Sequence, residues 1–241
     1  MVPWGTTEDA VEPACLLVAD YGELEAEYAA IRRGTAVFDR LDRGLIEMRG
    51  PDAADLISRL LTNAVPDEGG SIRGFLLAKN GRILSDLHVV VESNLILLDV
   101  DRTDVAKLIE HLESFIFGED VEIVDLTETR QRIELHGPDV FKTFSSAFPD
   151  NPPRHWSLDV GGRTPCGVPG IAVDVDLKDA EDVWEKLNLT IATGARPPRA
   201  IGWHAYNIAR IEYGSPMFHI DFGPDALPQE TGLLDERVSF T

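Results

Sequence analysis

One short pattern occurs twice in the chain, and it constrains the fold more than any other feature. Residues 46–53 (IEMRGPDA) are similar to residues 133–140 (IELHGPDV). Each copy reads as a β-strand, a Gly-Pro-Asp turn and the start of a helix, because proline suits the first turn of a helix. The repeat therefore predicts two related α+β modules with antiparallel sheets.

The length of the chain agrees with two modules, since 241 residues suffice for two domains of roughly 100 to 120 residues that each bury a core. We expect the first module over residues 45–127, and the second over residues 1–44 together with 128–223. Residues 224–241, rich in proline, glycine and acids, read as an extended connection. A ligand is expected between the modules, because clefts at domain interfaces are favoured sites.

Apolar residues at helical spacing predict a helix over residues 22–33 and another from Pro198 to Tyr213. Each is followed by a glycine, Gly34 and Gly214, which suits a left-handed helix end. Thr103 is the expected N-cap of a further helix.

Composition excludes several classes of protein. The 42 acidic and 22 basic residues give a net charge of −20, which repels phosphate backbones and anionic lipids, so nucleic-acid and membrane partners are not expected. The N-terminus does not resemble a signal peptide, and a cytoplasmic location is expected. Cys15 and Cys166 indicate neither a disulfide framework nor a zinc site, and the six histidines form no ligand pattern, so no metal is expected.

Several motifs in order resemble the aminomethyltransferase-like superfamily, which includes the glycine-cleavage T-protein. They are residues 37–39 (VFD), 46–53 (IEMRGPDA), 60–63 (LLTN), 81–87 (GRILSDL) and 209–214 (ARIEYG). The resemblance covers roughly residues 20–241. It implies the GcvT/YgfZ folate-binding fold, built of ferredoxin-like modules, and tetrahydrofolate as the cofactor.

The end of the chain resembles one branch of that superfamily. Residues 227–233 (LPQETGL) and 238–241 (VSFT) are similar to the YgfZ type, folate-binding proteins linked to iron–sulfur enzymes. In that branch a Lys-Gly-Cys motif and a small β-barrel follow, so we expect both to be absent from a chain that ends at Thr241. Residues 166–171 (CGVPGI) stand where T-proteins typically carry a GYTGEDGFE-like run, which argues against glycine-cleavage chemistry.

Three functions are consistent with the resemblance. The first is a tetrahydrofolate-binding protein of iron–sulfur cluster assembly or repair, with folate and iron–sulfur proteins as partners. The alternative is a folate-dependent aminomethyltransferase or demethylase, which would transfer an aminomethyl or methyl group to tetrahydrofolate. The third is a structural or regulatory module without catalysis. Turnover of a substrate is left open.

Glu212 is the candidate for binding the pterin ring. The pterin 2-amino group and N3–H form a donor pair that one carboxylate can accept. Glu212 lies at the end of a predicted helix, where its charge opposes the helix dipole, and this unfavourable position suggests a function. The alternative is a solvated glutamate paired with Arg210, which lies in the same family segment and is itself a candidate ligand.

Asp86 is the candidate catalytic residue and a second folate ligand. Residues 83–91 and 94–100 read as a hairpin, and strand alternation places Leu84, Asp86, His88 and Val90 on one face. A carboxylate there could stabilise positive charge near the folate N5 and N10 nitrogens, or accept a proton. The alternative is a half-exposed strand with polar residues facing water.

Three basic residues are candidates for the anionic glutamate tail of folate. Arg73, Lys79 and Arg82 lie around a predicted turn at Asn80-Gly81 and would form a local basic cluster in an acidic protein. Their alternative role is ordinary solvation beside a turn.

Overall fold

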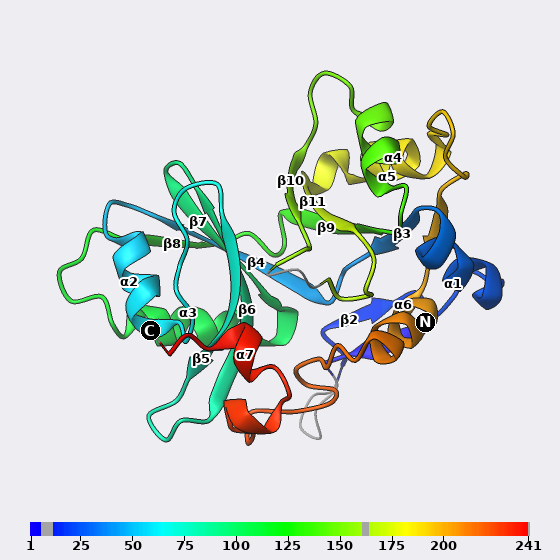
Figure 1. Ribbon diagram of the computed structural model, residues 1–241. Helices are drawn as coiled ribbons and strands as arrows, with labels where there is room; N and C mark the ends of the chain where they lie inside the picture. Colours follow the sequence, from blue (N-terminus) through cyan, green and yellow to red (C-terminus); the bar gives the residue numbers. More distant parts are fainter. Residues whose placement is uncertain (6–11, 161–163, 241) are drawn as a thin grey trace. The chain divides into compact units, whose positions relative to one another are not determined.

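The computed structural model describes residues 1–5, 12–160 and 164–240, and it divides the chain into two compact units. The units are numbered by the residue at which each begins, so their order differs from that of the two expected modules. The first unit comprises Met1–Asp42 and Glu128–Ser215, and the second comprises Arg43–Thr127 and Pro216–Thr241. Each unit contains a five-stranded sheet with helices, so the predicted α+β class with antiparallel sheets is confirmed (Figure 1).

The sheet of the second unit has the strand order β5-β6-β7-β4-β8, and all neighbouring strands are antiparallel. Its members are β4 (Arg43–Arg49), β5 (Ser71–Leu77), β6 (Ile83–Glu92), β7 (Leu95–Asp101) and β8 (Glu122–Asp125). β6 and β7 form the predicted hairpin. They are rich in branched apolar residues, which favour strands.

Two helices cover one face of this sheet, α2 (Ala53–Leu60) and α3 (Val105–Glu113) (Figure 1). Leu56 and Ile57 of α2, and Leu108 and Leu112 of α3, join the apolar strand residues in one buried cluster. Burying each such side chain contributes about 1.5–3 kcal/mol, so this cluster is the main support of the unit. The opposite face of the sheet carries Asp86.

The sheet of the first unit has the order β10-β11-β9-β3-β12. Its strands are β3 (Ala36–Asp39), β9 (Arg130–His136), β10 (Arg154–Ser157), β11 (Gly170–Asp176) and β12 (Arg199–Ile201), and only β12 pairs in parallel, with β3. The helices are α1 (Leu24–Arg33), α4 (Val140–Ala147), α5 (Ala180–Leu189) and α6 (Trp203–Tyr213), and a short two-stranded sheet joins β1 (Val2–Trp4) to β2 (Cys15–Leu17).

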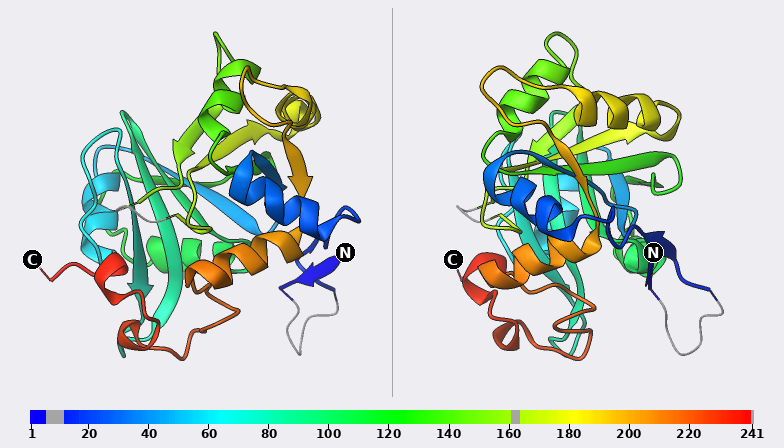
Figure 2. Two further views of the ribbon diagram at one scale, coloured as in Figure 1. Left: turned by 45° about the vertical axis from the view of Figure 1, so that its right-hand side comes forward. Right: turned by 90° about the vertical axis from the view of Figure 1, so that its right-hand side faces the viewer.

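The core of the first unit lies between this sheet and the pair α4 and α5, while α1 and α6 run side by side (Figure 2). Val37, Leu135 and Val173 from three neighbouring strands pack against Phe144 of α4 and Leu187 of α5. Residues that alternate with these, such as Glu134, lie on the other face of the sheet.

The strand, turn and helix expected at both Gly-Pro-Asp segments are present, as β4 with α2 and as β9 with α4. Gly50 has φ 111° and Gly137 has φ 131°, a backbone region that favours glycine. A Cβ would also overlap the carbonyl oxygen of Asp120 at the first turn and that of Gly34 at the second. Both turns therefore require glycine for two separate reasons.

Two predicted helix ends are wrong. Gly34 has φ −153°, so helix α1 ends without the left-handed cap expected there, whereas Gly214 has the expected left-handed conformation with φ 74°. Thr103 is not the N-cap, because the Asp101 side chain accepts from the Thr103 backbone N–H at 2.9 Å. Asp101 thus caps a short 3-10 helix, η1 (Arg102–Asp104), which precedes α3.

The helix predicted from Pro198 is also wrong over its first turn. Arg199–Ile201 form β12 instead, and α6 begins only at Trp203. The Arg199 backbone N–H donates to the Thr35 carbonyl at 2.9 Å, which starts the pairing with β3. A partner strand far away in the sequence therefore outweighs the local helical pattern.

The C-terminal residues contain two short helical segments, η3 (Pro228–Glu230) and α7 (Leu234–Arg237). Phe218 and Leu233 from this part of the chain are buried together with Phe75 of β5 and Ile83 of β6. The segment therefore contributes its own apolar cluster to the second unit. Among the described residues, no helix has both the length and the apolar character needed to span a bilayer.

Candidate functional site

Asp86 lies on the predicted face of β6, opposite the helix-covered face. Its cross-strand neighbour is Phe75 of β5, and two residues further along, His88 lies between Arg73 of β5 and Asp99 of β7. His88 and Asp99 are buried at 2% exposure, whereas Leu84 at the start of the same face is exposed, so the face is shielded from water only beyond its first residues. It is a polar surface held within the protein.

The structure gives Asp86 a partner that the sequence did not indicate. Arg237 of α7 donates from Nε to Asp86 Oδ1 at 3.0 Å, and the two side chains are 7% and 17% exposed. Among the described residues, no other donor lies within hydrogen-bond distance of the Asp86 carboxylate. The two residues are 151 positions apart, too far for local sequence patterns to connect them.

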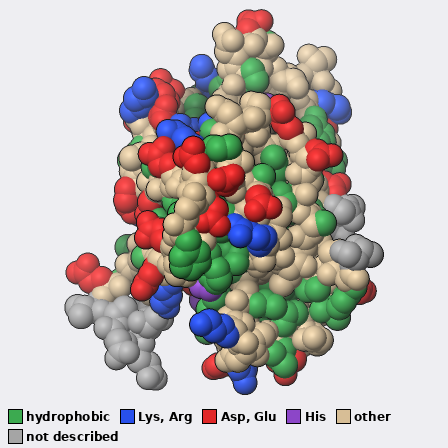
Figure 3. Space-filling model, turned by 90° about the vertical axis from the view of Figure 1, so that its left-hand side faces the viewer, with side chains coloured by type: hydrophobic (Ala, Val, Ile, Leu, Met, Phe, Trp, Pro, Cys, Tyr) green, Lys and Arg blue, Asp and Glu red, His purple; other side chains and the backbone are tan. Residues whose placement is uncertain are grey.

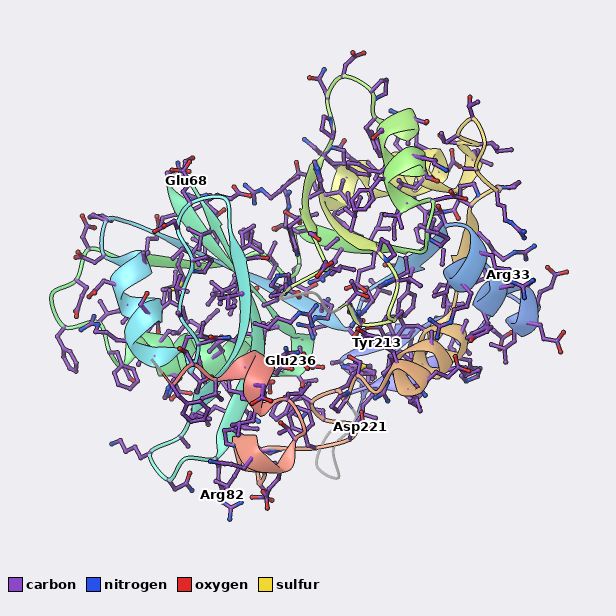
Figure 4. All side chains as sticks on the ribbon, in the orientation of Figure 1. Arg33, Glu68, Arg82, Tyr213, Asp221 and Glu236 are labelled. Carbon is purple, nitrogen blue, oxygen red and sulfur yellow. The ribbon has the colours of Figure 1, made fainter. Side chains whose placement is uncertain are left out.

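The three basic candidates do not form one cluster. Arg73 lies in the middle of β5, opposite His88, whereas Lys79 and Arg82 lie at the β5–β6 turn. At a rise of about 3.3 Å per residue, the turn is more than ~10 Å from Arg73. Arg82, labelled in Figure 4, donates from Nη1 to the Asp225 carbonyl.

Because the protein is strongly acidic, an anionic ligand is repelled except where basic side chains are exposed. Figure 3 shows acidic side chains spread over much of the face that it draws, as the net charge of −20 requires. Lys79 is exposed at the β5–β6 turn and Arg82 lies three residues further on. This turn is therefore a local basic site within a repulsive field.

Glu212 lies in the last turn of α6, and its side chain is 52% exposed. Its Oε2 accepts hydrogen bonds from the Tyr28 hydroxyl and, at 2.9 Å, from Arg32 Nη2, both on α1. These bonds lower the pKa of the Glu212 carboxyl below its ordinary value. In the alternative interpretation Glu212 would pair with Arg210, but its partner is Arg32 from the neighbouring helix.

Arg32 connects three parts of the first unit. Besides Glu212, its guanidinium donates to the Cys166 carbonyl at 2.7 Å and to the Ala209 carbonyl at 3.3 Å. The carboxylate is thus fixed through an arginine that is itself held at two backbone positions. Although Glu212 is half exposed, two hydrogen bonds to Oε2 fix the orientation of its carboxylate, and Oε1 takes part in neither of them.

Arg210 lies on the same helix but has a different setting. It is buried at 2% exposure and donates to the Asn207 side chain at 2.8 Å and to the Ser215 carbonyl at 3.3 Å. The contact with Ser215 satisfies a backbone carbonyl just beyond the helix end. Arg210 therefore stabilises the end of α6 directly.

The first unit contains a buried charged network that the sequence patterns did not indicate. Arg40 donates two hydrogen bonds to Asp42, at 2.8 and 2.7 Å, and one to Glu134 at 2.8 Å. Glu134 also accepts from Arg132 at 2.7 Å and lies 3.0 Å from His136 Nε2. The alternation of Arg132, Glu134 and His136 along one strand was the available signal.

The cations in this network determine the protonation of Glu134. Burial alone would raise the pKa of its carboxyl, but Arg40 and Arg132 outweigh burial and hold that pKa well below its ordinary value. The guanidinium of Arg40 also lies over the ring of Tyr206, 4.9 Å from its centroid. The carboxylate therefore stays ionised, and Arg40 links it to Tyr206 of α6.

Cys166 lies beside this network but does not have the properties of a nucleophile. Its side chain is fully buried, and burial raises the pKa of the thiol far above its ordinary value. A thiol that stays protonated is unreactive. In the described part of the chain, no three His, Cys, Asp or Glu side chains gather in an arrangement that could hold a metal ion.

More than half of the chain matches a known protein family. Residues 19–155, more than half of the chain, match the GCVT N-terminal domain. The chain belongs to this family. The match includes β4, β9 and both Gly-Pro-Asp turns, so the repeat that predicted the fold is part of the GCVT domain.

Curated relatives of this GCVT-family chain carry the name aminomethyltransferase. The protein of Thermotoga petrophila is 28% identical over 230 residues, which cover 88% of this chain and 62% of the relative. That of Deinococcus deserti is 25% identical over 251 residues, covering 95% of this chain and 64% of the relative. The chain thus spans less than two thirds of the length of these relatives.

A solved structure agrees in fold. The glycine cleavage system aminomethyltransferase T from Bartonella henselae superimposes with a TM-score of 0.76 at 22% identity, covering 88% of this chain and 60% of that one. The GcvT-like fold expected from the sequence is therefore confirmed.

Proposed function

We propose that the chain binds tetrahydrofolate and takes part in transferring an aminomethyl group to it, in the manner implied by the names of its relatives. The observation that carries the proposal is the match of residues 19–155 to the GCVT N-terminal domain. The relatives named aminomethyltransferase support this function over the iron–sulfur function that the sequence suggested first.

The two candidate carboxylates fit a folate ligand in their chemistry. Asp86 has Oδ1 engaged by Arg237 and Oδ2 without a partner among the described residues, and Glu212 has Oε2 engaged in the same way. Each therefore offers one oriented acceptor oxygen. Pterin N–H groups are donors, so such oxygens match their hydrogen-bonding needs.

Bound tetrahydrofolate would supply the N5 and N10 nitrogens that receive the one-carbon unit. The Asp86 carboxylate would stabilise positive charge on those nitrogens, or accept the proton released as the new bond forms. Glu212 would accept from the pterin through Oε1, because Oε2 already takes two hydrogen bonds. Lys79 and Arg82 would attract the anionic tail against the net negative charge.

Calorimetric titration with 5-formyltetrahydrofolate tests the proposal. Loss of a charged acceptor is expected to weaken binding about 10- to 100-fold in Asp86→Asn and in Glu212→Gln. Glu119→Gln is the matched control, since Glu119 is likewise paired with an arginine, at 2.9 Å from Arg59. Absence of binding to the wild type would refute the proposal, and an equal loss in the control would remove both residues from the site.

Iron–sulfur cluster maintenance is the second candidate, and only the resemblance of residues 227–233 and 238–241 to the YgfZ branch favours it. Cys166 offers no support, because its thiol is buried with a raised pKa. Deleting the gene and measuring an iron–sulfur enzyme in the cell separates the two functions. Lost aminomethyl transfer with unchanged iron–sulfur activity would exclude this candidate.

A further inference from the structure

The contact between Arg237 and Asp86 is built from two distant segments. Asp86 belongs to strand β6, in the middle of a paired sheet, whereas Arg237 is the last residue of α7. Arg237 is nearly fully buried, and its second ion pair, with Glu236, is longer at 3.5 Å. The shorter bond, to Asp86, is therefore its principal charged contact.

The backbone of α7 is fixed where this contact requires it. The Thr62 hydroxyl donates to the Arg237 carbonyl at 2.6 Å, and the Ser239 backbone N–H donates to the Thr62 carbonyl at 2.9 Å. Asn63 Nδ2 donates at 3.0 Å to the carbonyl of Glu236, which Figure 4 labels on α7. The Thr-Asn pair thus binds both sides of the position that carries the guanidinium.

The same two residues also fix the sheet. The Thr62 hydroxyl accepts from the Phe75 backbone N–H at 2.8 Å, and Asn63 Nδ2 donates to the Arg73 carbonyl at 3.0 Å. Both acceptor and donor lie on β5, which pairs with β6 and brings Phe75 opposite Asp86. One short segment therefore sets the positions of α7 and of the strand pair that carries the carboxylate.

We propose that Arg237 is a positioning residue for Asp86, which it holds through Oδ1 so that Oδ2 is presented to the one-carbon ligand. This inference rests on the proposed folate function and names the residue that prepares its carboxylate. A charge-assisted hydrogen bond from a buried guanidinium restricts the carboxylate to one orientation. A preoriented acceptor binds its ligand without a further loss of side-chain freedom.

A double-mutant cycle on the full chain tests the role. The affinity for 5-formyltetrahydrofolate is measured by calorimetry for the wild type, Arg237→Gln, Asp86→Asn and the double variant. Arg237→Gln is expected to weaken binding on the order of tenfold, and to change it less than about twofold once Asp86 is already asparagine. A purely structural role would lower affinity equally in both backgrounds.

Two further variants make the result decisive. Arg237→Lys keeps the charge but not the Nε geometry, so it should lose less affinity than Arg237→Gln. In the Asp86→Asn background it should cause no further loss of affinity. This variant also serves as the probe if Arg237→Gln does not fold. Arg59→Gln removes an exposed arginine pair of the same unit and should bind like the wild type.

The outcomes separate the two proposals. Absence of wild-type binding would overturn the folate function and the positioning role together. The positioning role alone would be overturned if the wild type binds and Asp86→Asn weakens binding, but the Arg237 variants have no effect or the same effect in both backgrounds. The folate function would then stand.

Discussion

Asp39 of β3 is expected to destabilise the first unit at neutral pH. Burial raises the pKa of its carboxyl from 3.8 to about 6, the hydrogen bond from Gln131 opposes this rise, and the nearby Asp42 adds to it. Because the pKa is higher in the folded than in the unfolded state, the folded state binds more protons between about pH 4 and pH 6. Stability therefore falls as the pH rises through that window.

The size of the effect follows from the two pKa values. A difference of about two units corresponds to about 3 kcal/mol, since each unit is worth 1.36 kcal/mol. This is an upper limit, because water screens a carboxyl that is not fully buried. Asp39→Asn removes the charge and keeps the oxygen that accepts from Gln131. It should stabilise the unit by about 1–3 kcal/mol near pH 7.5 and by almost nothing near pH 4.

Tryptophan fluorescence during urea unfolding measures this effect in the relevant unit alone. All four tryptophans belong to the first unit: Trp4, Trp156, Trp184 and Trp203. The exposed Asp150, replaced by asparagine, is the matched control and should change stability by less than about 0.5 kcal/mol. A gain that is equal at both pH values, or a variant less stable than the wild type near pH 7.5, would refute the reasoning.

Three other predictions follow from the charges. Glu134→Ala leaves Arg40 buried without one of its carboxylates and should lower the stability of the first unit by about 3–5 kcal/mol in the same fluorescence assay. The control Glu23→Ala breaks an exposed ion pair and should lower stability by less than about 1 kcal/mol, so equal losses would contradict the prediction. Burial alone would lower the pKa of His219, but Asp104 at 3.0 Å outweighs burial, so the pKa is raised. The contact should therefore stabilise the second unit below about pH 6.5 and lose this effect as the pH rises through the raised pKa. Amide hydrogen exchange should show this dependence, and a pH profile unchanged in His219→Gln would exclude it. Raising KCl from about 0.1 M to about 1 M should screen the repulsion within a chain of net charge −20 and raise the unfolding temperature, whereas a constant temperature would show that this repulsion is negligible.

Several features that depend on neighbouring residues were predicted correctly from the sequence, although the helix end at Gly34 and the cap at Thr103 were not. The Gly-Pro-Asp turns, the β6–β7 hairpin and the left-handed end at Gly214 each rest on a few consecutive residues. The alternation that placed Asp86 opposite the apolar face is also local. These interactions are formed within one strand or turn, so their pattern is visible in the sequence.

Features that depend on distant pairing were not predicted. Arg199–Ile201 has helical periodicity, yet it forms a strand because β3 offers backbone partners 163 positions away, as the pairing of Arg199 with Ala36 shows. The same limit applies to Arg237, whose contact with Asp86 appears only when α7 lies on β5. Tertiary contacts decided these cases against the local preference.

The buried carboxylates of the repeated strands also have a consequence for folding. Glu47 and Glu134 occupy equivalent places in the two copies, and each is almost fully buried on the face of its sheet away from the apolar core. A slip of β9 by one residue would turn Glu134 toward Val37 and Val173 and away from Arg40, the cation of the network that lies outside β9. The energetic cost of such a slip is large. Misaligned sheets are thereby disfavoured while the chain folds.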